Sequence, residues 1–135
     1  MGINYLLLDS ARKKIILREA VDEKQFWDKV KTELLDRSGI ARLADAKINC
    51  LKSDFMGILD FSLFNNYILI YSVGYYINKR YGFTTARGIT YDGNVIIVGR
   101  GYGEDYTSTI ISLSADAEKH VIDGVKTGKG IFVEL

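Results

Sequence analysis

Cys50 and His120 are the only cysteine and the only histidine in a chain of 135 residues. Such a pair can form a nucleophile, because the imidazole takes the thiol proton and the two groups need only meet in space. Cys50 stands among the apolar residues Ile48 and Leu51, however, where a buried and inert thiol is the usual case. We therefore expect no catalytic pair, and a zinc site would need more cysteine and histidine ligands than the chain has.

Residues 99–103 have the sequence Gly-Arg-Gly-Tyr-Gly and follow a predicted strand, as phosphate-binding loops do. Those loops are followed by a helix whose N-terminus supplies N–H groups to the anion. Here Glu104, Asp105 and a second β-rich run follow, which places negative charge where an anion would lie. The sequence therefore predicts a plain loop at residues 100–105, with no cofactor. No calcium-loop spacing is present, and we expect no metal.

Tyrosine is the residue type with an uneven distribution. Eight of the nine tyrosines lie between residues 67 and 106. Ordinary β-propensity explains such a cluster as well as function does. The functional alternative is a recognition surface, since tyrosine and arginine are the residues enriched at binding hot spots. The candidate partner-binding residues are Tyr67, Tyr71, Tyr75, Tyr76, Tyr81, Arg80 and Arg87.

Residues 79–83, Lys-Arg-Tyr-Gly-Phe, resemble the aromatic strand of RNA-recognition domains, where a basic residue precedes aromatics that stack on bases. The resemblance covers five residues. It lacks the glycine before the first aromatic, Thr84 replaces the next apolar residue, and no helix is predicted between this segment and the preceding strand. A second hypothesis is that the protein binds single-stranded nucleic acid. The bases would stack on Tyr75, Tyr76, Tyr81 and Phe83, beside the basic residues Lys79, Arg80 and Arg87.

A third hypothesis is a small hydrolase or nucleotide-binding enzyme. It requires polar groups to converge on one reacting centre. The available groups are Glu104, Asp105, Arg100 and His120.

The middle of the chain must position the tyrosines. Alternating apolar residues on both sides of Asn65-Asn66 predict a hairpin over residues 58–73, with residue 63 opposite 68 and 59 opposite 72. One face of this hairpin would be aliphatic, and the opposite face would carry Tyr67 and Tyr71. Asp92-Gly93 predicts a second hairpin between residues 88–91 and 94–99.

The N-terminal region predicts two strands and a helix. Residues 3–8 and 14–18 are apolar on both faces, so we expect this strand pair inside the sheet. Asp22 is the predicted N-cap of the helix, with Gln25 at the capping-box position and Val21 and Phe26 as a hydrophobic staple. The apolar stripe of this helix consists of Phe26, Trp27, Val30 and Leu34.

The C-terminal region predicts a strand, a helix and a strand. Residues 107–113 are β-rich, and Ser114 is a good N-cap. The second helix would turn Ala117, Val121 and Val125 inward and end at Gly128. Residues 130–134 form the closing strand.

The composition limits the class of protein. A chain of this length suits one domain, residues 1–135. A net charge of +1 lacks the basic excess of a dedicated nucleic-acid or membrane-surface protein. A single cysteine fits a reducing compartment, and no signal peptide or long apolar run is evident. We expect a cytoplasmic protein that does not associate with membranes.

These features predict an α+β fold: a mostly antiparallel sheet with an N-terminal amphipathic helix and a shorter C-terminal helix, both packed on one face. The predicted function is a small soluble protein-binding module, such as an inhibitor, an immunity-type protein or an adaptor, and not an enzyme. Its partner would be another protein, or a second copy of the chain in a homodimer.

Overall fold

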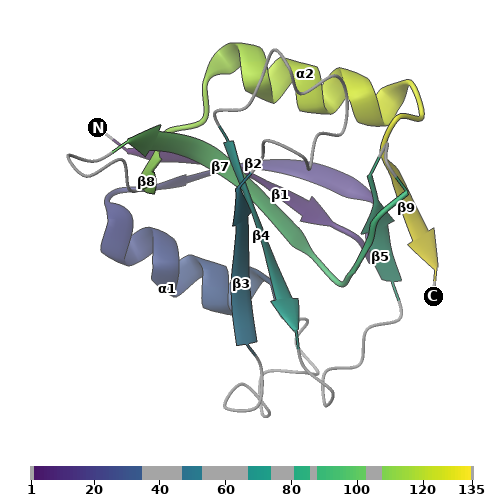
Figure 1. Ribbon diagram of the computed structural model, residues 1–135, viewed down its shortest axis with the longest axis horizontal. Helices are drawn as coiled ribbons and strands as arrows, with labels where there is room; N and C mark the ends of the chain where they lie inside the picture. The colour runs from purple at the N-terminus through teal and green to yellow at the C-terminus, as the bar shows by residue number, and fades with distance from the viewer. Residues whose placement is uncertain are drawn as a thin grey trace.

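A computed structural model describes the backbone of residues 2–34, 47–52, 67–73, 81–85, 88–102 and 108–134. The described chain is α+β, as predicted, and all of its strand pairs are antiparallel (Figure 1). Its elements in order are β1 (Ile3–Asp9), β2 (Lys14–Ala20), α1 (Glu23–Leu34), β3 (Lys47–Lys52), β4 (Tyr67–Val73), β5 (Tyr81–Thr84), β6 (Thr90–Asp92), β7 (Val95–Tyr102), β8 (Ser108–Ile111), α2 (Ala115–Lys126) and β9 (Ile131–Glu134).

The strands form two sheets. The large sheet has the order β2-β1-β7-β4-β3, with β8 paired to the end of β7, and the small sheet has the order β6-β5-β9. β7 is the central strand of the large sheet, and β1 and β4 flank it. Residues 5–8 of β1 and 95–98 of β7 are buried without a break, which means that both faces of the sheet are covered there.

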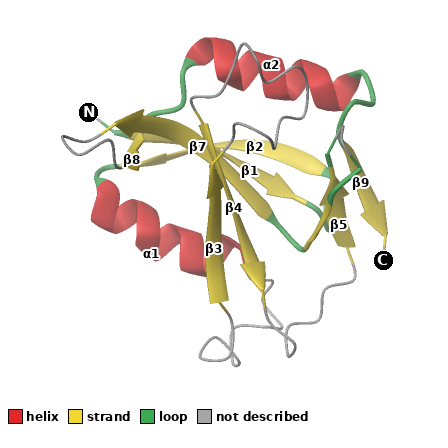
Figure 2. Ribbon diagram, in the orientation of Figure 1, coloured by secondary structure: helices red, strands yellow, loops and turns green. Residues whose placement is uncertain are grey.

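The two helices lie on opposite faces of the large sheet (Figure 2). Phe26 and Val30 of α1 pack with the odd-numbered residues of β1, whereas Ala117 and Val121 of α2 pack with the even-numbered ones. The prediction that both helices share one face is therefore wrong. Alternate residues of an apolar strand point to opposite faces, so each face of β1 and β7 needs its own cover. α2 has 12 residues, as many as the described α1, and residues 35–46, which follow α1, lie outside the described residues.

Both helices begin at the predicted caps. The Asp22 side chain accepts a hydrogen bond from the Gln25 N–H at 2.8 Å, and Ser114 Oγ accepts one from the Ala117 N–H at 3.1 Å. The Gln25 side chain accepts from the N–H of Val21 and not from that of Asp22, so the capping box is shifted by one residue. Val21 is 63% exposed and does not anchor the helix as the predicted staple would.

The N-terminal strand pair is confirmed, with Ile3 opposite Ala20 and Asp9 opposite Lys14. Its predicted place inside the sheet is right for β1, which pairs with both β2 and β7. It is wrong for β2, which forms an edge of the described large sheet and leaves Leu17 56% exposed. An apolar residue on a strand is thus not by itself a sign of an interior strand.

The predicted hairpin over residues 58–73 is wrong in its pairing. β4 is a strand as expected, but Ile68 pairs with Lys52 of β3 on one edge and with Val98 of β7 on the other. Both edges of β4 are therefore occupied, and residue 63 is not the partner of residue 68. Residues 53–66 lie outside the described residues.

The predicted hairpin at Asp92-Gly93 is also wrong. β6 before this turn pairs with β5 in the small sheet, whereas β7 after it pairs with β1, β4 and β8 in the large sheet. The chain passes from the small sheet to the large sheet at this turn, because β6 pairs with β5, the strand that precedes it. The hairpin that forms instead is β5–β6, closed by a 2.9 Å hydrogen bond from the Thr85 N–H to the Ile89 carbonyl.

The predicted loop at residues 100–105 is wrong for residues 100–102. β7 continues to Tyr102 and pairs with β8 from Gly99 opposite Ile111 to Tyr102 opposite Ser108. Glycine is what permits this pairing, because a Cβ atom at residue 99 would lie 2.7 Å from the Ile111 carbonyl oxygen and would clash with that of Ser112. Residues 103–105 lie outside the described residues.

Candidate functional site

Three of the seven predicted partner-binding residues fall within the described backbone. Tyr67 pairs with Gly99 and Tyr71 with Val95 across β4 and β7, and the side chains of both tyrosines lie outside what is described. Tyr81 is the first residue of β5 and is half-buried. The remaining four lie outside the described residues: Tyr75, Tyr76, Arg80 and Arg87.

The backbones of Tyr71 and Tyr81 approach the same short bend of the chain. Tyr71 pairs with Val95, the first residue of β7. Two residues earlier, the N–H of Gly93 donates a 2.6 Å hydrogen bond to the carbonyl of Tyr81. Two tyrosines from different sheets are thus held at neighbouring positions by the segment that links those sheets.

Asn94 fixes this bend to the rest of the fold. Its Oδ1 accepts from the N–H of Ser10 at 2.9 Å, and its Nδ2 donates to the carbonyl of Glu33, in the last turn of α1, at 2.8 Å. The buried Ser10 hydroxyl donates to the Gly93 carbonyl at 2.6 Å. The bend is therefore tied to α1 and to the turn that directly follows β1. Sequence analysis did not identify Asn94, although an asparagine after Asp-Gly is a typical turn residue.

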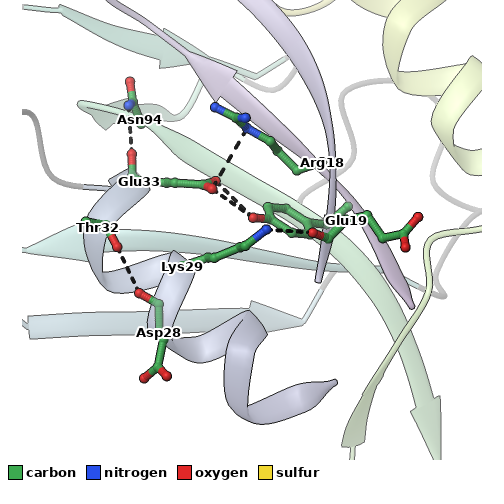
Figure 3. Close-up of polar contacts among 8 residues, drawn as sticks. Arg18, Glu19, Asp28, Lys29, Thr32, Glu33 and Asn94 are labelled. Carbon is green, nitrogen blue, oxygen red and sulfur yellow. Dashed lines mark hydrogen bonds and ion pairs between the residues drawn. The ribbon is translucent and has the colours of Figure 1, made fainter. Parts of the chain in front are cut away.

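A second polar cluster joins β1, β2 and α1, and Figure 3 shows its charged members. The Tyr5 hydroxyl donates to both carboxylate oxygens of Glu33, at 2.9 and 3.0 Å, and Nε of Arg18 lies 3.8 Å from the same carboxylate. Lys29 Nζ donates to the Glu19 carbonyl at 2.7 Å, which further ties α1 to β2. Tyr5 is the one tyrosine outside the sequence cluster, so nothing in the residue pattern singled it out.

The environment of Tyr5 keeps its hydroxyl protonated. Burial raises the pKa of Tyr5, and the negative charge of Glu33 and the hydrogen bond to it raise this pKa further, while Arg18 lowers it. The phenol is therefore a fixed hydrogen-bond donor to the carboxylate and a poor acid. We interpret this cluster as a set of polar contacts that holds α1 against the large sheet.

Replacing Tyr5 with phenylalanine is expected to lower the free energy of unfolding by about 1.5–3 kcal/mol near neutral pH, because Glu33 loses its donor. The raised pKa makes this contribution depend on pH. It is fully present below the ordinary tyrosine pKa of about 10 and is lost as the pH rises above that value.

Urea denaturation at several pH values from 8 to 11 measures the difference between the wild-type protein and Tyr5→Phe. Tyr81→Phe is the matched control, since it removes the same atom from a half-buried ring. A wild-type advantage that did not shrink above pH 10 would contradict this account of Tyr5.

The two residues of the possible Cys–His pair come from different elements. Cys50 lies in β3, at the edge of the large sheet, and its side chain is outside the described set, while His120 lies in α2. In the described part of the chain, no three His, Cys, Asp or Glu side chains are grouped to hold a metal ion. No helix in the same part is long and apolar enough to cross a membrane.

Comparison with known proteins identified no relative. No family model, no curated protein and no solved structure matches the chain. The function must therefore be inferred from the residues of the chain itself.

Proposed function

We propose that this protein is a small protein-binding module, of the inhibitor, immunity-protein or adaptor kind, whose partner is another protein or a second copy of the chain. The contact is made by a tyrosine-rich surface, defined as Tyr67, Tyr71, Tyr75, Tyr76, Tyr81, Arg80 and Arg87. Its aromatic rings supply the buried area, and the two arginines donate charge-assisted hydrogen bonds to acidic groups of the partner.

The convergence of Tyr71 and Tyr81 on the bend at residues 93–95 is the observation that supports this proposal. The backbones of these residues, which are ten positions apart in the chain and in different sheets, meet one bend through strand pairing at Tyr71 and a hydrogen bond at Tyr81. A binding surface assembled in this way gathers its aromatics near one centre, as hot-spot residues are gathered.

The anchoring of the bend by Asn94 also favours a binding role. Hydrogen bonds from Asn94 and Ser10 hold the bend in place before any partner arrives. A surface that is ordered in advance loses less conformational entropy on association, so more of the contact energy appears as affinity.

The double variant Tyr71→Ala/Tyr81→Ala tests the proposal. The partner is first captured from native lysate and purified, and self-association is measured by light scattering. Each hot-spot aromatic is worth about 2 kcal/mol or more, which is about 30-fold in affinity. Loss of both is therefore expected to weaken the affinity, or the self-association, by about 700-fold. The matched control is Lys24→Ala/Lys119→Ala, at two exposed positions on the helices. A folded double variant that keeps full affinity refutes the proposal.

Salt dependence separates this proposal from binding of single-stranded nucleic acid by the same residues. Phosphate contacts make affinity fall steeply as ionic strength rises, because binding releases counterions. An aromatic protein interface is much less sensitive to salt. Affinity that drops by orders of magnitude between 50 and 200 mM salt, about the range used for such tests, identifies a nucleic-acid partner instead.

A further inference from the structure

A cavity of about 280 Å³ lies where the β1–β2 turn, α2 and β9 meet. The described residues that line it are four with apolar side chains and two lysines. They are Lys13, Ile15, Ile122, Val125, Lys126 and Phe132. Among these described residues the cavity thus combines an apolar interior with positive charge and no carboxylate.

The apolar walls of the cavity are held in place by the protein core. Ile15, Val125 and Phe132 are half-buried and pack against the buried cluster under α2. The ring of Phe132 lies edge-on to the buried Phe83, with centroids 5.3 Å apart. These walls come from three elements that are distant in sequence, so the cavity exists only in the folded chain and is formed before any ligand binds.

Lys126 lies one helical turn after Ile122 on the face of α2 that lines the cavity. A lysine in the last turn of a helix often donates hydrogen bonds to the last backbone carbonyls of that helix. Here residues 127–129 satisfy them: the Thr127 N–H donates to Asp123 at 3.0 Å, and the Lys129 N–H to Gly124 at 2.9 Å. The Lys126 ammonium is therefore not needed as a cap.

Lys13 supplies the second charge from the turn between β1 and β2. Its φ of 56° is in the left-handed region, which is uncommon for a residue with a side chain. Within the described residues, neither Lys13 nor Lys126 forms an ion pair with a carboxylate. Both lysines are exposed at the cavity, where a bound anion would supply a negative charge to pair with their ammonium groups.

We propose that this cavity binds an aliphatic carboxylate, with the hydrocarbon chain against Ile122, Val125 and Phe132 and the carboxylate between Lys13 and Lys126. The cavity is at the small end of the range for ligand sites, which fits a single short chain better than a bulky ligand. Tyr81, the residue of the tyrosine-rich surface whose side chain is described, does not line the cavity. The proposal rests on the described lining residues alone and is tested independently of the proposed function.

Titration of the ¹⁵N-labelled full chain with octanoate, followed by NMR, tests the proposal. Saturable shifts are expected at residues 122, 125 and 132. Hexanoate should bind about 15-fold more weakly, because each methylene that is no longer buried costs about fourfold. Octanol and octylammonium keep the chain but lose the negative charge, and both should bind at least about tenfold more weakly than octanoate.

Variants of the two lysines complete the test. Lys126→Gln and Lys13→Asn should each weaken octanoate binding by about threefold, and asparagine tolerates the left-handed conformation at residue 13. Lys119→Gln, an exposed lysine of α2 outside the cavity lining, is the control and should have no effect. The proposal is overturned if octanol or octylammonium binds as tightly as octanoate, if the shifts lie elsewhere, or if the lysine variants bind as the wild-type protein does. The ligand series uses the unmodified chain and decides the matter even if a variant does not fold.

Discussion

Replacing Phe26 with alanine is expected to lower the free energy of unfolding by about 3–5 kcal/mol. Phe26 is fully buried, and its ring packs edge-on against Tyr5, with centroids 5.1 Å apart, and against Trp27 at 5.3 Å. It is the main apolar contact of α1 with the sheet, so its loss leaves a cavity at the centre of that interface. Such a change is a large part of the total stability of a small domain, about 5–15 kcal/mol.

Urea denaturation followed by circular dichroism measures this change, and Leu17→Ala is the control. Leu17 is 56% exposed on β2 and should change the free energy of unfolding by about 0.5 kcal/mol or less. The loss in Phe26→Ala should be accompanied by weaker amide protection across α1, because the helix is held to the sheet at this residue. Equal effects from the two substitutions would mean that α1 does not pack on the sheet through Phe26.

Replacing Gly99 with alanine is expected to cost about 3 kcal/mol, at the upper end for overpacking. The added Cβ would lie 2.7 Å from the Ile111 carbonyl oxygen and would also clash with the carbonyl of Ser112. Both obstacles are backbone atoms of the segment that includes β8, and backbone cannot rotate aside as a flexible side chain does. We expect β8 to separate from β7.

Gly128→Ala is the matched control for Gly99→Ala. Gly128 has a φ of +82°, but nothing lies within 4 Å of an added Cβ. Alanine there should cost only about 1–2 kcal/mol, for the left-handed backbone alone. Hydrogen exchange distinguishes the two, since only Gly99→Ala should remove amide protection from residues 108–111. Retained protection of these residues in a Gly99→Ala protein would show that β8 does not depend on a glycine at this position.

Local elements of the fold were predictable because their signals lie within a few residues. The Asp22 and Ser114 caps correctly predicted where the helices begin, since a cap side chain bonds a backbone N–H three residues away. The β1–β2 pair follows from two apolar runs and a short connection. The burial of β1 on both faces was visible as well, and it already implied a cover on each face. The prediction of both helices on one face does not agree with this burial.

Strand pairing was not predictable, because it depends on competition between partners distant in the chain. Asp92-Gly93 is a strong hairpin signal. The two strands beside it nevertheless do not pair with each other, because β7 pairs with β1 and β4 on its two edges and β6 pairs with β5. The glycines after Val98 suggested a loop, yet they allow β8 to approach β7 closely. In both places the local preference was real, and a long-range contact outweighed it.

The sequence by itself determined the α+β class, the starts of both helices, and the cluster of tyrosines in the middle of the chain, because propensity, capping and composition act locally. Only the tertiary structure decided that the helices lie on opposite faces and that Tyr71 and Tyr81 share one bend anchored by Asn94. It alone also showed that Lys13 and Lys126 flank one apolar cavity. These features join residues from separate elements, and their positions are set by the packing of the whole chain and not by any short segment of it.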